Sequence, residues 1–341
     1  MYARFRPFLF HLDAERAHHL TLTLLRWAGQ APITHYLLRS LFEVSDPRLE
    51  AEAFGLKFKN PVGLAAGYDK NGGAVRGLSA LGFGHVEVGT VTRLPQAGNP
   101  RPRVFRVPES NALINRMGFP NEGVERLGLP SGAWRAKGRV RIGINIGKGK
   151  ETPLERAAED YCALLEQVHD LADYVTLNVS SPNTLGLRQL QARAALEDLL
   201  KAVTVTRDGL TPRVPLLVKI APDLTELEID DLLAAALDSG VDGLIATNTT
   251  ISREGLPLHV ANIAGGLSGA PLRARSTEVI RYIAQHTEGK LPIVGVGGIL
   301  SPEDALEKLH AGAKLIQIYT GLVYAGPGLA REINRAVLAQ R

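Results

Sequence analysis

The segment that decides the fold is Tyr174-Val175-Thr176-Leu177-Asn178-Val179-Ser180-Ser181-Pro182-Asn183-Thr184. Its first four residues form an apolar run typical of a buried strand, and the next seven hold two amides and three hydroxyls around one proline. Turn formation would explain any one of these polar residues, because Asn and Ser bond locally to the backbone and Pro fixes φ. The chain, however, repeats this unit of an apolar strand that ends in polar side chains.

Short apolar runs recur from residue 62 onward, and helical patterns separate them. Continuous apolar strands are expected where helices cover both faces of a parallel sheet. We predict eight strands: Val62–Ala66, His85–Gly89, Val140–Ile146, Tyr174–Val179, Leu216–Ile220, Gly243–Thr247, Ile293–Val296 and Leu315–Tyr319. Eight strands alternating with helices over this length predict a (β/α)8 TIM barrel. The alternative is an open doubly wound sheet, which the absence of a Gly-x-Gly-x-x-Gly after the first strand disfavours.

Helix signals lie where this pattern needs them. Thr152 followed by Pro153 predicts a cap before a helix over 154–171. Residues 225–228 form a capping box, and Gly240 ends that helix. Ser301 and Pro302 begin another helix. Residues 47–60 form a connector with a short hairpin, and an insertion of about fifty residues separates the second strand from the third, too long for a plain βα connection.

Residues 1–43 differ in composition from the rest of the chain. Asp13 can cap a helix that runs to about Ala28 and ends at Gly29, and a second helix follows Pro32. Aromatic and leucine side chains are dense here, and arginines outnumber acids. Such an element can lie on a membrane surface, or it can be a helical cap packed on the main domain. We therefore divide the chain into an extension, residues 1–43, and a barrel domain, residues 44–341.

Composition excludes several other classes of protein. The 341 residues are 45% hydrophobic with a net charge of +4, and the basic residues form no block with aromatics, so no nucleic acid is expected. The single cysteine, Cys162, excludes an intrachain disulfide and a zinc cluster, and we expect no metal. No apolar run of about 18 residues is present. The N-terminus lacks the pattern of a signal peptide, so a cytosolic origin is expected.

The carboxyl ends of all barrel strands face one mouth, so their polar residues are expected to converge. Asn is frequent among them, and an amide both donates and accepts hydrogen bonds, which suits a planar heterocycle such as a pyrimidine or a flavin ring. Lys219 adds a positive charge that could stabilise an anionic reduced flavin. Glycine-rich segments at 265–269 and 295–299, with Gly321 after the last strand, predict phosphate binding beside strands seven and eight. Ser181 is the one candidate for proton transfer in the opening segment.

Five segments together resemble the dihydroorotate dehydrogenase family: GLAAGYDK (63–70), NRMGF (115–119), NVSSPNT (178–184), ATNTT (246–250) and GGLSG (265–269). The resemblance covers nearly the whole chain in the right order. It implies one FMN per chain and oxidation of (S)-dihydroorotate to orotate in pyrimidine synthesis. Soluble class 1 members carry a cysteine base where this chain has Ser181, and class 2 members carry a helical extension like residues 1–43. The resemblance therefore implies the class 2, quinone-dependent branch.

The resemblance also implies roles for individual residues. Ser181 would remove the C5 proton while hydride leaves C6 for flavin N5, and a quinone would reoxidise the flavin. Substrate-binding positions would be Lys70, Asn115, Arg116, Met117, Gly118, Phe119, Asn178, Asn183, Asn248 and Thr249. FMN-binding positions would be Ala66, Gly67, Thr90, Asn145, Asn178, Lys219, Thr247, Gly269, Gly298, Tyr319 and Thr320. The quinone site would include His18, Arg103 and Tyr319.

A monomer bound to the cytoplasmic face of the cell membrane through residues 1–43 is expected from the same resemblance. Two other functions remain open from the residues alone. One is a cofactor-free lyase or isomerase that binds a phosphorylated substrate, which would leave Lys219 and the extension unexplained. The other is a non-catalytic module on a membrane surface.

Overall fold

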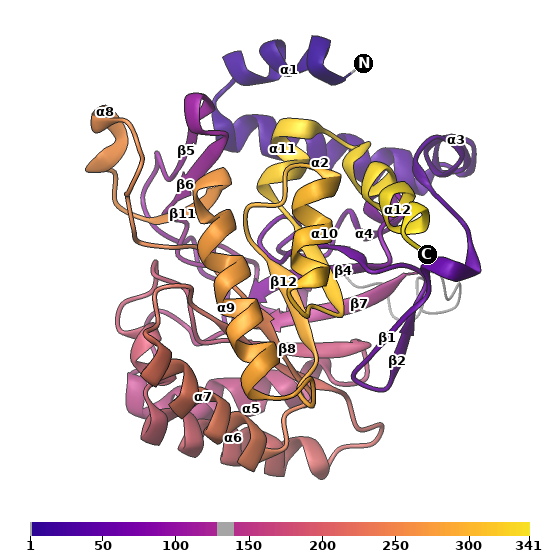
Figure 1. The fold of residues 1–341 in the computed structure, drawn as a ribbon. Coiled ribbons are helices and arrows are strands. Elements are labelled where there is room, and N and C mark those ends of the chain that lie inside the picture. Colours follow the sequence, from indigo (N-terminus) through magenta and orange to yellow (C-terminus); the bar gives the residue numbers. More distant parts are fainter. Residues whose placement is uncertain (1, 128–139) are drawn as a thin grey trace.

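A computed structural model of the chain describes residues 2–127 and 140–341 (Figure 1). Eight parallel strands close into a barrel, and the last pairs with the first, so the sheet has no free edge. In chain order they are β3 (Val62–Leu64), β4 (His85–Val91), β7 (Arg141–Ile146), β8 (Tyr174–Asn178), β9 (Leu216–Ile220), β10 (Gly243–Ala246), β12 (Ile293–Val296) and β13 (Leu315–Ile318). The predicted TIM barrel and its eight strands are confirmed.

Helices surround the barrel and follow its strands. They are α4 (Val75–Ser79), α5 (Ala157–Val168), α6 (Arg193–Asp208), α7 (Glu226–Ser239), α9 (Arg273–His286), α10 (Pro302–His310), α11 (Thr320–Ala325) and α12 (Leu329–Ala339). The capping boxes at Thr225 and Ser301 are both present. The predicted Thr152 cap is wrong: the Thr152 hydroxyl donates to Asp160 at 2.7 Å, and α5 begins only after a 3-10 turn at 154–156.

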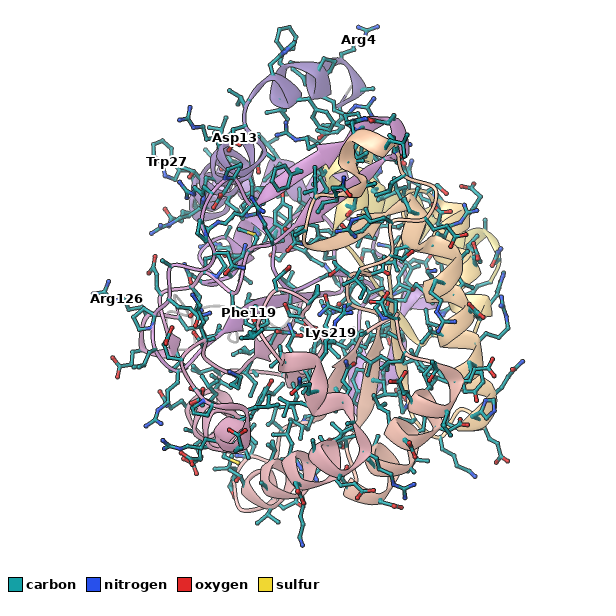
Figure 2. The ribbon with its side chains drawn as sticks, turned by 90° about the vertical axis from the view of Figure 1, so that its left-hand side faces the viewer. Arg4, Asp13, Trp27, Phe119, Arg126 and Lys219 are labelled. Atoms are coloured by element: carbon teal, nitrogen blue, oxygen red, sulfur yellow. The ribbon has the colours of Figure 1, made fainter. Side chains whose placement is uncertain are left out.

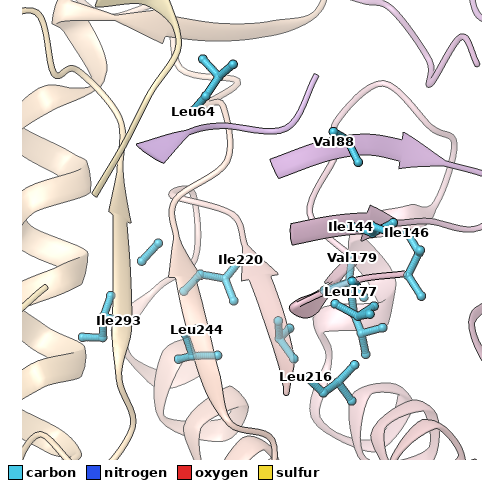
Figure 3. Close-up of a cluster of buried hydrophobic side chains, with 14 of the residues drawn as sticks. Leu64, Val88, Ile144, Ile146, Leu177, Val179, Leu216, Ile220, Leu244 and Ile293 are labelled. Atoms are coloured by element: carbon cyan, nitrogen blue, oxygen red, sulfur yellow. The ribbon is translucent and has the colours of Figure 1, made fainter. Parts of the chain in front are cut away.

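The main core lies between the barrel strands and these helices (Figure 3). Leu64, Val88, Ile144, Leu244 and Ile293 are at most 1% exposed, although each comes from a different strand. Burial of such side chains contributes about 1.5–3 kcal/mol each, before entropy is counted. This packing holds the strand ends, and therefore the mouth, in fixed positions.

The amino-terminal end of the barrel is closed by the predicted hairpin of β1 (Ala51–Ala53) and β2 (Leu56–Phe58). His85 is buried there at 0% exposure, with its ring 5.5 Å from Phe58 and 6.3 Å from Tyr174, edge to face. Neither ring nitrogen has a hydrogen-bonding partner in the described part of the chain. Burial lowers the pKa of His85 to about 3, so the folded protein holds it neutral.

Stability is expected to fall as the pH drops from about 6.5 toward 3. Over that range the unfolded chain protonates His85 while the folded chain does not, which costs about 3 kcal/mol by pH 4. His85→Phe should remove this contribution, so that its free energy of unfolding depends less on pH than that of the wild type. Urea unfolding at several pH values measures the difference. The same substitution at exposed His310 serves as control and should leave the wild-type pH dependence intact.

The insertion after β4 builds a small sheet beside the mouth. Strands β5 (Val104–Val107) and β6 (Ala112–Asn115) form a hairpin, and β11 (Gly266–Gly269) joins it from the loop after β10. The short helix α8 (Leu258–Ala261) belongs to that same loop. Two of the segments that the sequence singles out, 115–119 and 265–269, are thereby brought side by side.

The N-terminal extension contains three helices, α1 (Tyr2–His11), α2 (Ala14–Gln30) and α3 (Pro32–Phe42). Both predicted helices are present as α2 and α3, and the predicted number of two is corrected to three by α1. The additional helix α1 is held by contacts distant in sequence: the Tyr2 hydroxyl donates to the Val323 carbonyl at 2.6 Å, and Phe10 packs on Tyr324. Asp13 caps α2 as predicted. Gly29 does not end α2, because it serves packing instead: a Cβ there would lie 2.4 Å from the backbone nitrogen of Gly77 on α4.

The outer face of the extension carries many exposed apolar side chains. Phe8, Trp27, Ile33 and Tyr36 are 69–76% exposed, and Figure 2 shows Trp27 at the molecular edge. Among the residues that the structure describes, none of the helices has both the length and the apolar character needed to cross a membrane. The extension therefore packs on the barrel with one face and exposes an apolar face on the other side.

Candidate active site

A polar cavity opens at the carboxyl ends of the barrel strands. Its lining includes nineteen of the residues that the sequence predicts: Ala66, Gly67, Lys70, Thr90, Asn115, Met117, Gly118, Phe119, Asn178, Ser181, Asn183, Lys219, Thr247, Asn248, Thr249, Gly269, Gly298, Tyr319 and Thr320. Figure 2 shows Lys219 in the interior and Phe119 in the same central region of the molecule. The predicted convergence of strand ends is confirmed as geometry.

Two of the residues predicted to bind FMN or substrate do not line this cavity. Asn145 lies directly behind it, where its Oδ1 accepts from the Thr90 hydroxyl at 2.5 Å. Arg116 turns away: its guanidinium donates to the Pro102 carbonyl at 2.9 Å and lies over Phe105. The backbone carbonyl of Arg116 accepts from Asn99 Nδ2 at 3.0 Å.

The amides of the cavity hydrogen-bond to one another in two groups. Asn178 Nδ2 donates to Thr90 at 2.9 Å, and Asn248 Nδ2 donates to Asn178 Oδ1 at 3.2 Å. On the opposite side Asn183 Nδ2 donates to Asn115 Oδ1 at 3.1 Å. Each amide keeps part of its hydrogen-bonding capacity, so the cavity can bind a planar ring that has both carbonyl and N–H groups.

Ser181 is 5% exposed in the loop that follows β8, and its Oγ accepts the Asn183 N–H at 3.2 Å. No carboxylate or imidazole of the described residues hydrogen-bonds to Ser181, so its hydroxyl has no built-in general base. The loop itself is fixed by Arg188, which donates to the carbonyls of Ser180 at 3.0 Å and Thr249 at 2.8 Å. Arg188 also pairs with Asp223 at 2.7 Å, which joins the loops after three successive strands.

Two lysines give the cavity its positive charge. Burial lowers the pKa of Lys70 to about 8, and its ammonium donates to the Gly67 carbonyl at 2.7 Å. Burial also lowers the pKa of Lys219, and the Glu87 carboxylate at 3.9 Å acts in the opposite direction. The Lys219 ammonium has no hydrogen-bonding partner among the described residues, so it can bind an electronegative atom of a ligand.

The far wall of the cavity suits an anionic group. Gly298 has φ +74°, and a Cβ there would lie 2.4 Å from the Arg273 Cα. Gly269 has φ +101° and is equally crowded by the Asn111 carbonyl at 2.3 Å. Only glycine fits at such positions, and it lets a ligand approach backbone N–H groups closely. Together with Lys219, these features fit a ligand that carries both a planar ring and a phosphate group, such as a flavin mononucleotide.

Glu87 and Gln317 are buried polar residues near this cavity that the sequence analysis missed. Gln317 lines the cavity, and its Nε2 donates to Glu87 at 2.9 Å. A signal was present: His85 and Glu87 alternate with valines in an otherwise apolar strand, and side chains two apart share a face. A charged residue on the inner face of a barrel strand marks an interior polar contact.

A second, mostly apolar cavity lies between the extension and the barrel. Its lining includes Tyr2, Phe10, His18, Leu24, Tyr68 and Arg106, and it shares Met117 and Tyr319 with the polar cavity. Burial lowers the pKa of His18 to about 3, so the ring is neutral. The predicted Arg103 does not line this cavity; it pairs with Glu15 of α2 at 2.7 Å.

Comparisons with known proteins agree with this arrangement. The family described as "Dihydroorotate dehydrogenase" matches residues 48–340. A relative from Roseiflexus sp. (strain RS-1), named dihydroorotate dehydrogenase (quinone), is 50% identical over 100% of this chain and 94% of its own length. One from Methylococcus capsulatus with the same name is 52% identical, covering 98% of each chain.

Among solved structures, the crystal structure of DHODH from Eimeria tenella in complex with ferulenol superposes with a TM-score of 0.89. It is 37% identical and covers 98% of this chain and 94% of that chain. The fold, the polar cavity and the full-length similarity agree, and the chain belongs to the dihydroorotate dehydrogenase family.

Proposed function

We propose that the chain oxidises (S)-dihydroorotate to orotate in de novo pyrimidine synthesis, with a quinone as electron acceptor. The observation that carries this function is the pair of cavities, one polar and one apolar, whose linings among the described residues have Met117 and Tyr319 in common. A charged pyrimidine and an apolar quinone need separate sites of these two kinds, close enough for electrons to pass between them.

The cofactor is FMN, one per chain, held by the residues that the sequence analysis assigns to it. Lys219 would bind the electronegative edge of the ring, and the loops around Gly298 and Thr320 would receive the phosphate. When bound, a flavin supplies an acceptor for the two electrons of the oxidation and can pass them on to a quinone. Thr90 and Asn178 would orient the ring through the amide network behind it.

The substrate would lie against the Asn115–Phe119 segment and the loop after β8. Asn115, Asn178, Asn183 and Asn248 would bind the carbonyl and N–H groups of the pyrimidine. Lys70 would attract the carboxylate. Ser181 would take the C5 proton and pass it to water, because none of the described side chains hydrogen-bonded to it is a base.

The quinone would bind in the apolar cavity beside His18 and Tyr319. Arg103 acts on this site indirectly in our proposal, since its pairing with Glu15 docks α2 against the insertion. Residues 1–43 therefore form a membrane-associating domain, and residues 44–341 form the catalytic domain. We place the protein as a monomer on the cytoplasmic face of the cell membrane, with the apolar face of the extension in the lipid.

Purified protein should be yellow, lose its flavin absorbance when dihydroorotate is added, and regain it on addition of a quinone. If fumarate or NAD⁺ restored the absorbance readily and a quinone did not, the choice of acceptor would be wrong. A colourless protein would instead favour the cofactor-free lyase or isomerase.

The double variant Trp27→Glu/Ile33→Glu is expected to lose most of its binding to lipid vesicles. Both side chains are largely exposed, at 69% and 76%, so the charges should be tolerated in the fold but not in the acyl region of a membrane. Vesicle sedimentation measures the binding, and reduction of the flavin by dihydroorotate should be unchanged. Leu227→Glu on α7, 72% exposed, is the control and should bind vesicles like the wild type.

A further inference from the structure

Glu87 lies on β4 inside the barrel, behind the polar cavity, and is 0% exposed. A buried carboxylate is costly unless charges and hydrogen bonds compensate it. Asn145 Nδ2 donates to it at 2.8 Å and Gln317 Nε2 at 2.9 Å, from β7 and β13. The Lys219 ammonium on β9 is 3.9 Å away.

Two weaker donors complete the surroundings of Glu87. The Tyr174 hydroxyl lies at 3.3 Å and the Thr176 hydroxyl at 3.4 Å, both from β8. Neither residue lines the polar cavity. The carboxylate therefore has donors from three strands and a cation from a fourth, which is the environment of an anion that only accepts hydrogen bonds.

An acceptor-only group determines which way a neighbouring amide faces. Because Asn145 turns its Nδ2 to Glu87, its Oδ1 points toward the cavity side, where it accepts from the Thr90 hydroxyl at 2.5 Å. The same oxygen accepts from Asn178 Nδ2 at 3.3 Å. The orientation of the Asn178 amide thus follows from that of Asn145.

The chain of orientations continues to the substrate side. With its Nδ2 committed to Thr90 and Asn145, Asn178 turns its Oδ1 to Asn248 Nδ2, at 3.2 Å. Asn248 Oδ1 in turn accepts the backbone N–H of Thr249 at 2.8 Å. Asn178 and Asn248 both line the polar cavity. The donors and acceptors that they present to a ligand therefore trace back to one buried carboxylate.

The orientation of the Gln317 side-chain amide also follows from Glu87. Its Nε2 is taken by the carboxylate, and its Oε1 is buried without a partner among the described residues. Gln317 lines the polar cavity.

We infer that Glu87 is a positioning residue that fixes the amide orientations of Asn145, Asn178 and Asn248, and with them the donor–acceptor pattern offered to flavin and substrate. This role rests on the proposed flavin-dependent function. Glu87 does not line the polar cavity, and it acts through hydrogen bonds that all donate toward it, from Asn248 in the loop after β10 through Asn178 and Asn145.

The test compares E87Q with E87D. Glutamine keeps the shape but offers a donor as well as an acceptor, so it no longer imposes one orientation. Aspartate loses a methylene but remains acceptor-only. FMN is titrated into the apoprotein, and orotate into the reconstituted protein. Both ligands should bind E87Q at least about tenfold more weakly than wild type, because the network loses at least one well-formed charge-assisted hydrogen bond. E87D should stay closer to the wild type in both titrations.

A purely structural role predicts the opposite order, with isosteric E87Q closer to wild type, and that result would overturn the inference. Wild-type dissociation constants in E87Q would also overturn it. If E87Q does not fold, the double variant E87Q/K219M replaces it, and K219M becomes the reference protein. Equal orotate binding by E87Q/K219M and K219M would again refute the positioning role of Glu87. E43Q, which alters a carboxylate paired with Lys59 outside the barrel, should match wild type. Failure of the wild-type protein itself to bind FMN would instead refute the proposed function.

Discussion

Ser181→Ala is expected to keep its bound flavin and to reduce it with dihydroorotate roughly 10²–10⁴-fold more slowly than the wild type, because a positioned proton acceptor contributes that range. The substitution removes one hydroxyl whose single hydrogen bond within residues 2–127 and 140–341 is from the Asn183 N–H, so the loop should keep its conformation. Anaerobic stopped-flow mixing with dihydroorotate measures the rate of flavin reduction directly, apart from any quinone step.

Ser180→Ala provides the matched control for this prediction. Ser180 is also buried, but it does not line the polar cavity: its hydroxyl accepts from Asn248 at 2.9 Å and donates to Asn178 Oδ1 at 3.3 Å. Its loss should slow flavin reduction by no more than about tenfold, because one of its two hydrogen bonds is long, at 3.3 Å, and both support amide side chains without carrying a proton. Loss of flavin from the Ser181 variant would show a structural role for Ser181, and an unchanged reduction rate would exclude it as the proton acceptor.

Lys219→Met is expected to lower the free energy of unfolding of the apoprotein by about 3 kcal/mol, because it leaves the buried carboxylate of Glu87 without its cation. Adding Glu87→Gln should restore most of that loss, since the second substitution removes the uncompensated charge. Urea unfolding of the two variants and the wild type measures both effects.

Lys57→Met is the control for the charge effect. Lys57 pairs with Glu52 at 3.4 Å, but both side chains are more than 70% exposed, and such pairs contribute little. Its free energy of unfolding should stay within about 0.5 kcal/mol of the wild type. A double variant no more stable than Lys219→Met would mean that Glu87 does not depend on Lys219 for its stability in the core.

The sequence predicts the barrel and most of the candidate site because both depend on local patterns. Apolar runs of strand length identify the eight strands, and the residue after each run must lie at the mouth of a closed parallel barrel. Asn178, Lys219 and Thr247 could therefore be assigned to one cavity before any contact between them was known. Arg116, Asn145 and Arg103 were exceptions, since only the fold shows them bonded to Pro102, Thr90 and Glu15 instead.

The extension shows where such patterns fail. Glycine is common where helices end, yet Gly29 lies within α2. It is glycine there because a side chain would clash with the backbone of Gly77. Helix α1 depends on Val323 and Tyr324, more than 300 residues away, and nothing in residues 2–11 encodes that partner.

The sequence by itself determined the eight strands, the polar residues at their ends and the serine in the loop after the fourth strand, because short-range periodicity and chain order are enough for these. Only the tertiary structure decided how buried polar groups pair. Glu87 meets Gln317 across 230 positions and Arg103 meets Glu15 across 88. Burial strongly favours such pairings, since an unpaired group there costs several kcal/mol, but the choice of partner is set by the closure of the barrel and the docking of α2.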